Sequence, residues 1–248
     1  MRRPTLLCIV MTGWVSSGCE PQQPAKPKPD PAQVAMAEEL YEAAKVGDYL
    51  DAANLIKKGA DVNLENESGN IPLHAASWYR HVDVAELLLD NGSKADHGNK
   101  AGRTPLHVAT INDSAEIARM LIDRGADINK ADDAGQTAAE FAAMYGSTEL
   151  MTLYLEAGAN PNYANDNGVS LLMRAAWNAN DAAVEVLLEH GANASDRDNG
   201  RRTAWDYAKQ REGNDNVIAL LNKRLGGRRS LGLLDTAGIA VTREETTA

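Results

Sequence analysis

Histidine is the side chain with acid–base and metal-binding chemistry near neutral pH, and this 248-residue chain has five: His74, His81, His97, His107 and His190. A metal site would need several of them on one face, joined by cysteine or carboxylate ligands. His81 follows His74 by seven residues, which would stack both on one continuous helix, but the sequence predicts two short helices that break near Arg80. His97 and His190 are isolated, and we expect them to be solvated. The histidines therefore predict no metal site.

Acidic clusters suggest a second chemistry, calcium binding, at DRDNG (196–200) and NDNG (165–168). An EF-hand loop needs alternating oxygen ligands, glycine at its sixth place and glutamate at its twelfth. With Gly200 as the sixth residue, the loop would start at Ser195 and end at Asp206. With Gly168 as the sixth, it would start at Tyr163. Neither register supplies the ligands, so we expect both clusters to be hairpin turns.

The sequence supplies no residue set for catalysis. It has no glycine-rich phosphate loop, nucleophile elbow or paired-cysteine metal motif. We therefore predict a protein that is not an enzyme and needs no metal or cofactor. The net charge of −10 also argues against a nucleic-acid partner, because phosphate binding needs a basic face.

The elements that would position these residues repeat every 33 residues. Glycines recur at 59, 92, 125, 158 and 191, and predicted helix starts recur at Ile71, Thr104, Thr137, Ser170 and Thr203. A third series comprises Asn66, Asn99, Asp132, Asn165 and Asp198. Three independent series with one period cannot arise by chance.

Each recurring residue type has a physical role. Thr and Ser are N-cap residues, and Pro72 and Pro105 suit the first helical position. The glycines suit the left-handed backbone that ends a helix, and Asn or Asp ahead of a second glycine suits a tight turn. Aromatics make up only 5% of the chain, so we expect a core of small Ala and Leu contacts.

This pattern resembles the ankyrin repeat with its T-P-L-H-x-A signature, seen here as IPLHAA at 71–76 and TPLHVA at 104–109. The resemblance covers residues 35–225 as about six units and implies an all-α repeat solenoid, in which helix-turn-helix units carry protruding β-hairpin loops. In that family the signature histidine, here His74 and His107, makes hydrogen bonds between loop and helix. The first unit looks like an N-terminal cap. Gly200 lies one place early, which predicts a distorted last hairpin.

Ankyrin domains generally bind other macromolecules through a concave surface, and two adjacent positions near the end of each first helix contact partners. Those positions carry Trp or Tyr at four of ten places in this chain. They are Trp78–Tyr79, Ile111–Asn112, Met144–Tyr145, Trp177–Asn178 and Gln210–Arg211. The alternative is that the rings cover neighbouring helices. Because the aromatics recur at one repeat position, we favour a partner-binding groove.

The predicted hairpin tips would add a polar rim to this groove. The rim residues are Glu67, Asn70, Lys100, Arg103, Asp133, Gln136, Asp166 and Arg202. An apolar strip with a mixed polar border is typical of a protein interface. We therefore expect a monomeric repeat domain that binds another protein, and we assign Tyr154, Trp205 and Tyr207 to packing.

The N-terminus differs from the repeats. A basic start, an apolar run at 5–15 and SSGC at 16–19 resemble the signal and lipobox of bacterial lipoproteins, although Ser16 stands where that family usually has Leu. This predicts a signal peptide at 1–18, lipidation of Cys19 and a Pro-rich linker at 19–34. Cleavage by ordinary signal peptidase is the alternative. The expected location is the periplasm, with a lipid anchor on the outer membrane.

The sequence thus predicts a non-enzymatic protein-binding module of the bacterial periplasm. Three roles remain open at this stage: an immunity protein that neutralises a toxin, an adaptor for an envelope stress-defence enzyme, or a structural envelope component. The tail at 226–248 has no repeat, and the sequence does not decide whether it docks on the last helix pair.

Overall fold

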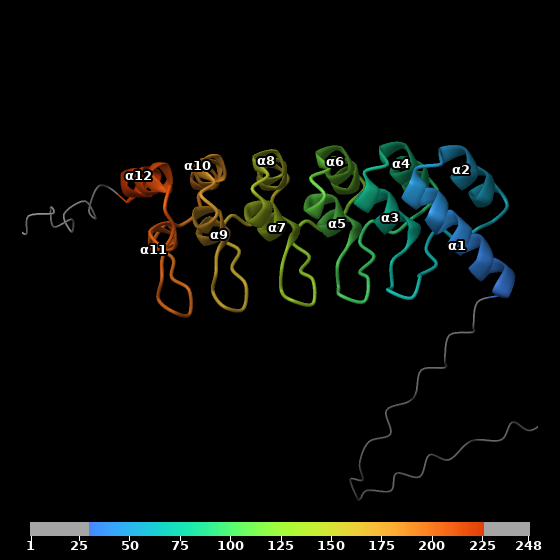
Figure 1. Cartoon of the computed structure of the whole chain (residues 1–248), viewed down its shortest axis with the longest axis horizontal. Helices are drawn as coiled ribbons and strands as arrows, with labels where there is room; N and C mark the ends of the chain where they lie inside the picture. Colours follow the sequence, from blue (N-terminus) through green and yellow to red (C-terminus); the bar gives the residue numbers. More distant parts are fainter. Residues whose placement is uncertain (1–29, 226–248) are drawn as a thin grey trace, which may run out of the picture. The chain divides into compact units, whose positions relative to one another are not determined.

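The computed structural model describes residues 30–225, and these residues form twelve α-helices in six consecutive pairs (Figure 1). The predicted signal peptide, Cys19 and most of the linker lie outside the described residues, as does the tail. Within the described range no strand forms, and the loops contain two isolated bridges, Ala131–Thr137 and Ala164–Ser170. The predicted all-α repeat solenoid of six units is therefore confirmed.

The helices lie in two rows, and the hairpin loops extend from the first row (Figure 1). The first row contains α1 (Pro31–Val46), α3 (Pro72–Tyr79), α5 (Pro105–Ile111), α7 (Ala138–Tyr145), α9 (Leu171–Trp177) and α11 (Ala204–Ala208). The second contains α2 (Tyr49–Lys57), α4 (Val82–Asp90), α6 (Ala115–Asp123), α8 (Thr148–Glu156), α10 (Asp181–Glu189) and α12 (Asp215–Arg224). The main contacts join partners within a pair and equivalent helices of adjacent pairs. Each unit is thus supported by its immediate neighbours.

The array begins with a helix of 16 residues, twice the length of α3. α1 starts at Pro31, earlier than the expected boundary at residue 35, because proline at the first helical turn loses no hydrogen bond and already has a helical φ. The helix buries Leu40, Ala43 and Ala44 against the array. Its exposed side carries polar residues, as expected of a terminal cap.

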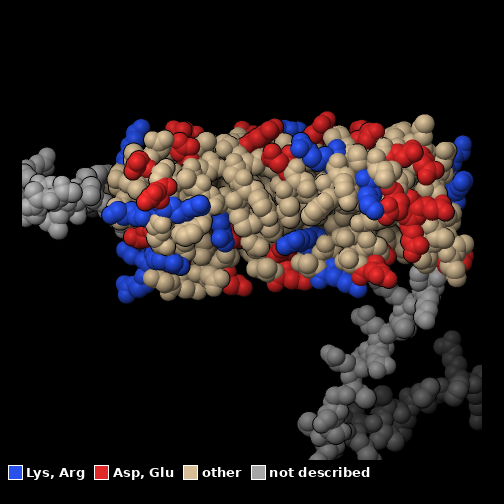
Figure 2. All heavy atoms as spheres, viewed as in Figure 1, with Lys and Arg blue, Asp and Glu red and all other residues tan. Residues whose placement is uncertain are grey.

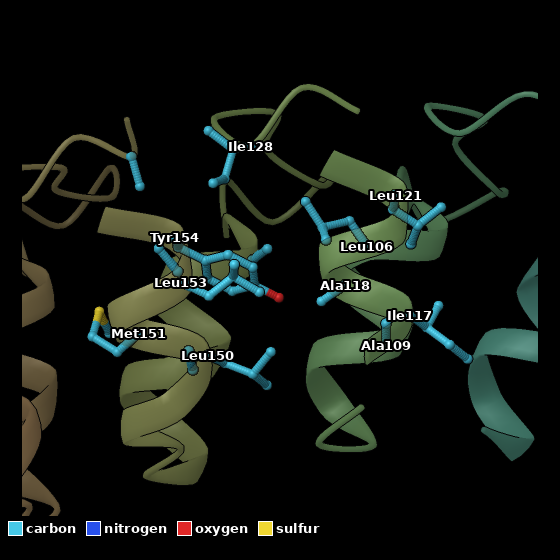
Figure 3. Close-up of a cluster of buried hydrophobic side chains, with 14 of the residues drawn as sticks. Leu106, Ala109, Ile117, Ala118, Leu121, Ile128, Leu150, Met151, Leu153 and Tyr154 are labelled. Atoms are coloured by element: carbon cyan, nitrogen blue, oxygen red, sulfur yellow. The ribbon is translucent and has the colours of Figure 1, made fainter. Parts of the chain in front are cut away.

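The core between neighbouring units consists mainly of alanine and leucine, as predicted from the scarcity of aromatics (Figure 3). Leu106 and Ala109 of α5 and Leu121 of α6 are fully buried. Tyr154 of α8 is the largest fully buried side chain of the described residues, and its hydroxyl is hydrogen-bonded to the Thr110 hydroxyl. The predicted packing role of Tyr154 is therefore confirmed.

The hairpins keep one geometry in all five loops. In the first, the Asn66 amide donates to the Asn70 carbonyl and the Gly69 amide donates to the Asn66 carbonyl. In the last, Asp198 makes the same pair of bonds with Arg202 and Arg201. Arg201 adopts the left-handed φ of 65° that glycine supplies in the other hairpins. The predicted distortion was wrong, because a non-glycine residue can take this conformation at a cost of about 1–2 kcal/mol.

Candidate protein-binding groove

The predicted groove residues come together because the repeat places them at one end of successive first helices. Trp78 and Tyr79 are each 47% exposed, Tyr145 is 57% exposed and Trp177 is 36% exposed. Ile111 and Met144 lie between them in the repeat and are half-buried. We call these six residues the groove strip: Trp78, Tyr79, Ile111, Met144, Tyr145 and Trp177. A row of exposed large rings is typical of an interface. Trp177 also meets Tyr207 of the next unit edge-on, with ring centroids 6.1 Å apart.

Two predicted groove residues have a role inside the array. The Asn178 side-chain amide donates to the carbonyls of Ala143 and Met144, at 3.2 and 2.9 Å, and so links α9 to the end of α7. The Asn112 amide donates to the Val108 carbonyl at 3.0 Å in its own helix. Both side chains are half-buried, so they hold the helix ends that carry the groove strip.

A cavity of about 240 Å³ lies at the N-terminal end of the groove strip. It is lined by Tyr41, Asn70, His74, Trp78, Tyr79, Asn99, Arg103, Val108 and Ile111. Tyr41 comes from α1 and was missed by the sequence reasoning, because α1 contains none of the residues that recur every 33 positions. Burial raises the pKa of Tyr41, and a hydrogen bond with Asn66 lowers it by less. The hydroxyl therefore stays protonated and can donate at neutral pH.

The signature histidines lie beneath this surface, where they join each hairpin to the next. The Nε2 atoms of His74 and His107 lie 3.0 Å from the carbonyls of Arg103 and Gln136, respectively. Burial lowers the pKa of His74 to about 4 and also lowers that of His107. The loop-to-helix role predicted from the family resemblance is confirmed.

His97 corrects one prediction. Its side chain is only 15% exposed, and its Nε2 lies 3.1 Å from the Gly69 carbonyl. Its ring meets that of His74 edge-on with centroids 5.8 Å apart. His97 is therefore neither isolated nor solvated. No signal in the sequence indicated this contact, because it joins the hairpins of two adjacent units.

Glu140 occupies the signature histidine position in the next unit, 33 residues after His107. It is buried, and its Oε1 accepts from Arg174 Nη2 at 2.8 Å and from Asn165 Nδ2 at 3.0 Å. An ion pair thus replaces the histidine-to-carbonyl bond in joining two units. The sequence reasoning did not identify this pair, although the period places Glu140 in line with both histidines.

The hairpin tips that were predicted to form the rim are polar, and two of their arginines are positioned by buried carboxylates. Glu67, Lys100, Asp133 and Asp166 are exposed at the hairpin tips. Arg103 Nε lies 3.4 Å from the buried Asp132, and its guanidinium lies 5.5 Å from the centre of the Phe141 ring. These contacts order the arginine before a partner binds, which lowers the entropic cost of binding.

The last hairpin holds its arginine in the same way. Burial would raise the pKa of Asp198, but hydrogen bonds from the Arg202 amide, the Tyr207 hydroxyl and the Arg202 side chain lower it overall. Asp198 therefore stays ionised and pairs with Arg202 at 2.7 Å. Tyr207 is buried, in agreement with its predicted packing role.

Among residues 30–225, no cluster of three or more His, Cys, Asp or Glu side chains is placed to hold a metal ion. None of the helices in this part of the chain is both long and apolar enough to cross a membrane.

Several solved structures share this architecture. An ankyrin-repeat domain from Acinetobacter baumannii is 25% identical, with a TM-score of 0.69 over 75% of this chain and 96% of that one. The complex of a predatory endopeptidase from Bdellovibrio bacteriovorus with an immunity protein contains a chain that is 29% identical, with a TM-score of 0.68 over 75% and 97% of the two chains. The ankyrin-repeat domain of Bcl-3, of the IkappaB family, is 26% identical, with a TM-score of 0.69 over 75% and 85%.

Comparison with curated proteins gave no match. The family profile of three ankyrin repeats matches residues 40–132 and again residues 135–227, and a second ankyrin-repeat profile matches residues 114–153. These segments span most of the chain and coincide with the helix pairs. Ankyrin repeats are protein-interaction modules whose fold is typically a non-catalytic scaffold. The chain belongs to the ankyrin-repeat family.

Proposed function

We propose that this protein binds and inhibits a partner protein through the groove strip, in the manner of an immunity protein. The observation that carries the proposal is the row of exposed rings, Trp78, Tyr79, Tyr145 and Trp177, at one repeat position. Each such ring can bury roughly 150–250 Å² of surface, and aromatic anchors of this kind dominate the binding energy of many interfaces. The similar chain in the complex of an endopeptidase with an immunity protein favours inhibition over an adaptor role.

The proposed location is the periplasm, with the chain anchored to the outer membrane through acylated Cys19. The support is the basic start, the apolar run at 5–15 and Gly18–Cys19. Mass spectrometry of the purified membrane form should therefore give an N-terminal peptide that begins at Cys19 and carries acyl chains. A Cys19→Ala variant should leave the membrane fraction, because the anchor is lost. An unmodified N-terminus beyond residue 19 would refute the anchor.

Replacing Trp78 and Tyr79 together by alanine should abolish partner capture without unfolding the protein. Truncating a central aromatic anchor costs about 2 kcal/mol or more of binding, roughly thirtyfold in affinity. The two rings are half exposed, so the thermal midpoint should hardly move. The measurement is quantitative capture from an envelope extract of the producing bacterium, followed by an activity assay of the captured protein with and without the array.

Two variants serve as controls for this experiment. Tyr49 is 43% exposed at the start of α2, outside the groove strip, so Tyr49→Ala should capture normally. Trp205 is half-buried with Lys209 over its ring, so Trp205→Ala should lower the thermal midpoint. If the Trp78/Tyr79 variant melts much earlier, the rings are packing residues. If it captures at full strength, the groove strip is not the binding site.

A further inference from the structure

The two ends of the array carry opposite charge. Residues 38–67 hold eight acidic and three basic side chains, whereas residues 197–212 hold five basic and three acidic ones. Figure 2 shows this difference, with acidic side chains over α1 and basic side chains over α11 and the last hairpin. The overall charge is negative, so the basic end is a local reversal of the field of the molecule.

The cations at this end are exposed, and four of the five form no ion pair within residues 30–225. Arg202 is paired with Asp198, as described above. Arg201 and Arg211 form no ion pair with any carboxylate in residues 30–225. Asp206, the acidic residue that lies between them in the sequence, accepts hydrogen bonds from the amide and hydroxyl of Thr203. Positive charge therefore remains available to a partner.

Arg202 and Arg211 belong to an ordered stack. The Arg211 guanidinium lies 5.7 Å from the centre of the Trp177 ring. Trp177 meets Tyr207 edge-on at 6.1 Å, and the Arg202 guanidinium lies 4.7 Å from the Tyr207 ring. We call Trp177, Arg202, Tyr207 and Arg211 the terminal stack. A guanidinium held over a ring can still bind carboxylate oxygens through its N–H groups. Arg202 already donates to Asp198 and to the Tyr207 hydroxyl, and Arg211 Nη1 donates to the Trp177 carbonyl at 3.4 Å. The remaining N–H groups of the two side chains are the ones available to a partner.

An apolar cavity adjoins the terminal stack. It has a volume of about 150 Å³ and is lined by Val169, Met173, Arg174, Trp177, Arg202, Tyr207 and Gln210. Arg174 is neutralised by the buried Glu140, so the walls are mainly apolar with guanidinium groups on the edge. Such a cavity suits one apolar side chain that is flanked by carboxylates.

We propose that the terminal stack and its cavity bind an acidic segment of the partner protein, with one apolar side chain inserted beside Trp177. The inference rests on the proposed function and adds the chemistry of the partner. It also gives a direction: the acidic part of the partner lies over α9 and α11, and any basic part lies towards α1. Charge complementarity at both ends would fix the orientation of the partner along the groove.

The test uses a fluorescein-labelled dodecapeptide of Ser and Glu with one central Phe, and the same peptide with Lys in place of Glu. Binding to the full chain is measured by fluorescence anisotropy at low and moderate salt. We expect the Glu peptide to bind more tightly than the Lys peptide. The affinity of the Glu peptide should fall as salt screens the exposed charges. In an NMR titration it should shift the Trp177 indole resonance.

A matched pair of variants removes two charges each. The double variant Arg201→Asn with Arg211→Gln should lower the affinity for the Glu peptide at least fivefold. Asn is chosen at 201 because it tolerates the left-handed backbone. Lys57→Asn with Lys58→Gln removes two exposed charges from the end of α2 and should change affinity less than twofold. Both variants have the same net charge, so long-range repulsion of the peptide is equal in the two.

Three results would overturn the proposal: equal affinity in the two variants, equal binding of the Lys peptide, or tighter binding of a single-stranded 12-mer oligonucleotide at the same residues. The last result would identify a polyphosphate site instead. If the Glu peptide fails but protein capture still depends on Trp78 and Tyr79, this inference falls and the proposed function stands.

Discussion

Replacing Tyr154 by alanine is expected to lower the free energy of unfolding by about 3–5 kcal/mol, the largest loss of any single change considered for this protein. Tyr154 is completely buried in α8, where it packs among Leu and Ala side chains of two units (Figure 3). The truncation removes a whole ring from a tightly packed core, and it leaves the Thr110 hydroxyl without one of its two partners. Urea unfolding followed by circular dichroism measures the loss.

Tyr145→Ala is the matched control, because it deletes the same side chain from a surface position. Tyr145 is 57% exposed on the groove strip, and its ring stacks on Phe141 with centroids 6.2 Å apart. Its removal should cost less than about 1 kcal/mol of stability, as is usual for exposed positions. Equal losses in the two variants would show that Tyr154 is not the packing residue that the structure describes.

Acidification should destabilise the array between about pH 6.5 and pH 4, before most carboxylates titrate. The folded protein holds the pKa of His74 at about 4, whereas an unfolded histidine has a pKa near 6.5. In this window the unfolded state binds a proton that the folded state does not, so stability falls as the pH falls. For His74 alone the loss reaches about 3 kcal/mol at pH 4, and His107 adds a loss of the same sign.

Urea titrations at pH 7, 6, 5 and 4.5 measure this effect. His74→Gln should be less stable at pH 7, since the bond to the Arg103 carbonyl is weakened, but its stability should depend less on pH. His190→Gln is the control for the substitution itself, because it makes the same change at an exposed position and should leave the stability at pH 7 nearly unchanged. A parent protein whose stability is constant from pH 7 to 4.5 would contradict the burial-induced pKa shift.

The 33-residue period of the sequence was enough to predict most of the fold. Residues such as Thr137 and Ser170 were predicted as N-caps, and their hydroxyls accept from the Glu140 and Met173 amides. The prediction succeeds at these positions because a cap is a local interaction over three residues. Thr203 makes the same bond, whereas α3 begins after Ile71, which has no hydroxyl. The row of exposed rings was also predictable, since a fixed repeat position always faces the same side of the solenoid.

The features that the sequence did not reveal depend on contacts between units or on departures from the repeat. His97 is largely covered by the neighbouring hairpin, and a sequence pattern contains no information about that contact. The Glu140–Arg174 pair spans 34 residues and uses residue types absent from the family signature. Arg201 keeps the last hairpin regular because the backbone hydrogen bonds, rather than the position of Gly200, determine the turn.

Because each helix pair mainly contacts the adjacent pairs, such a protein can change in whole units over generations. A unit boundary is a place where the chain can be cut and rejoined without altering the packing elsewhere, provided that the two end units keep their solvent-facing sides. Duplication or loss of a 33-residue block would therefore lengthen or shorten the groove in whole steps. Recognition of a new partner could evolve by exchanging one block, while the remaining blocks preserve a folded scaffold.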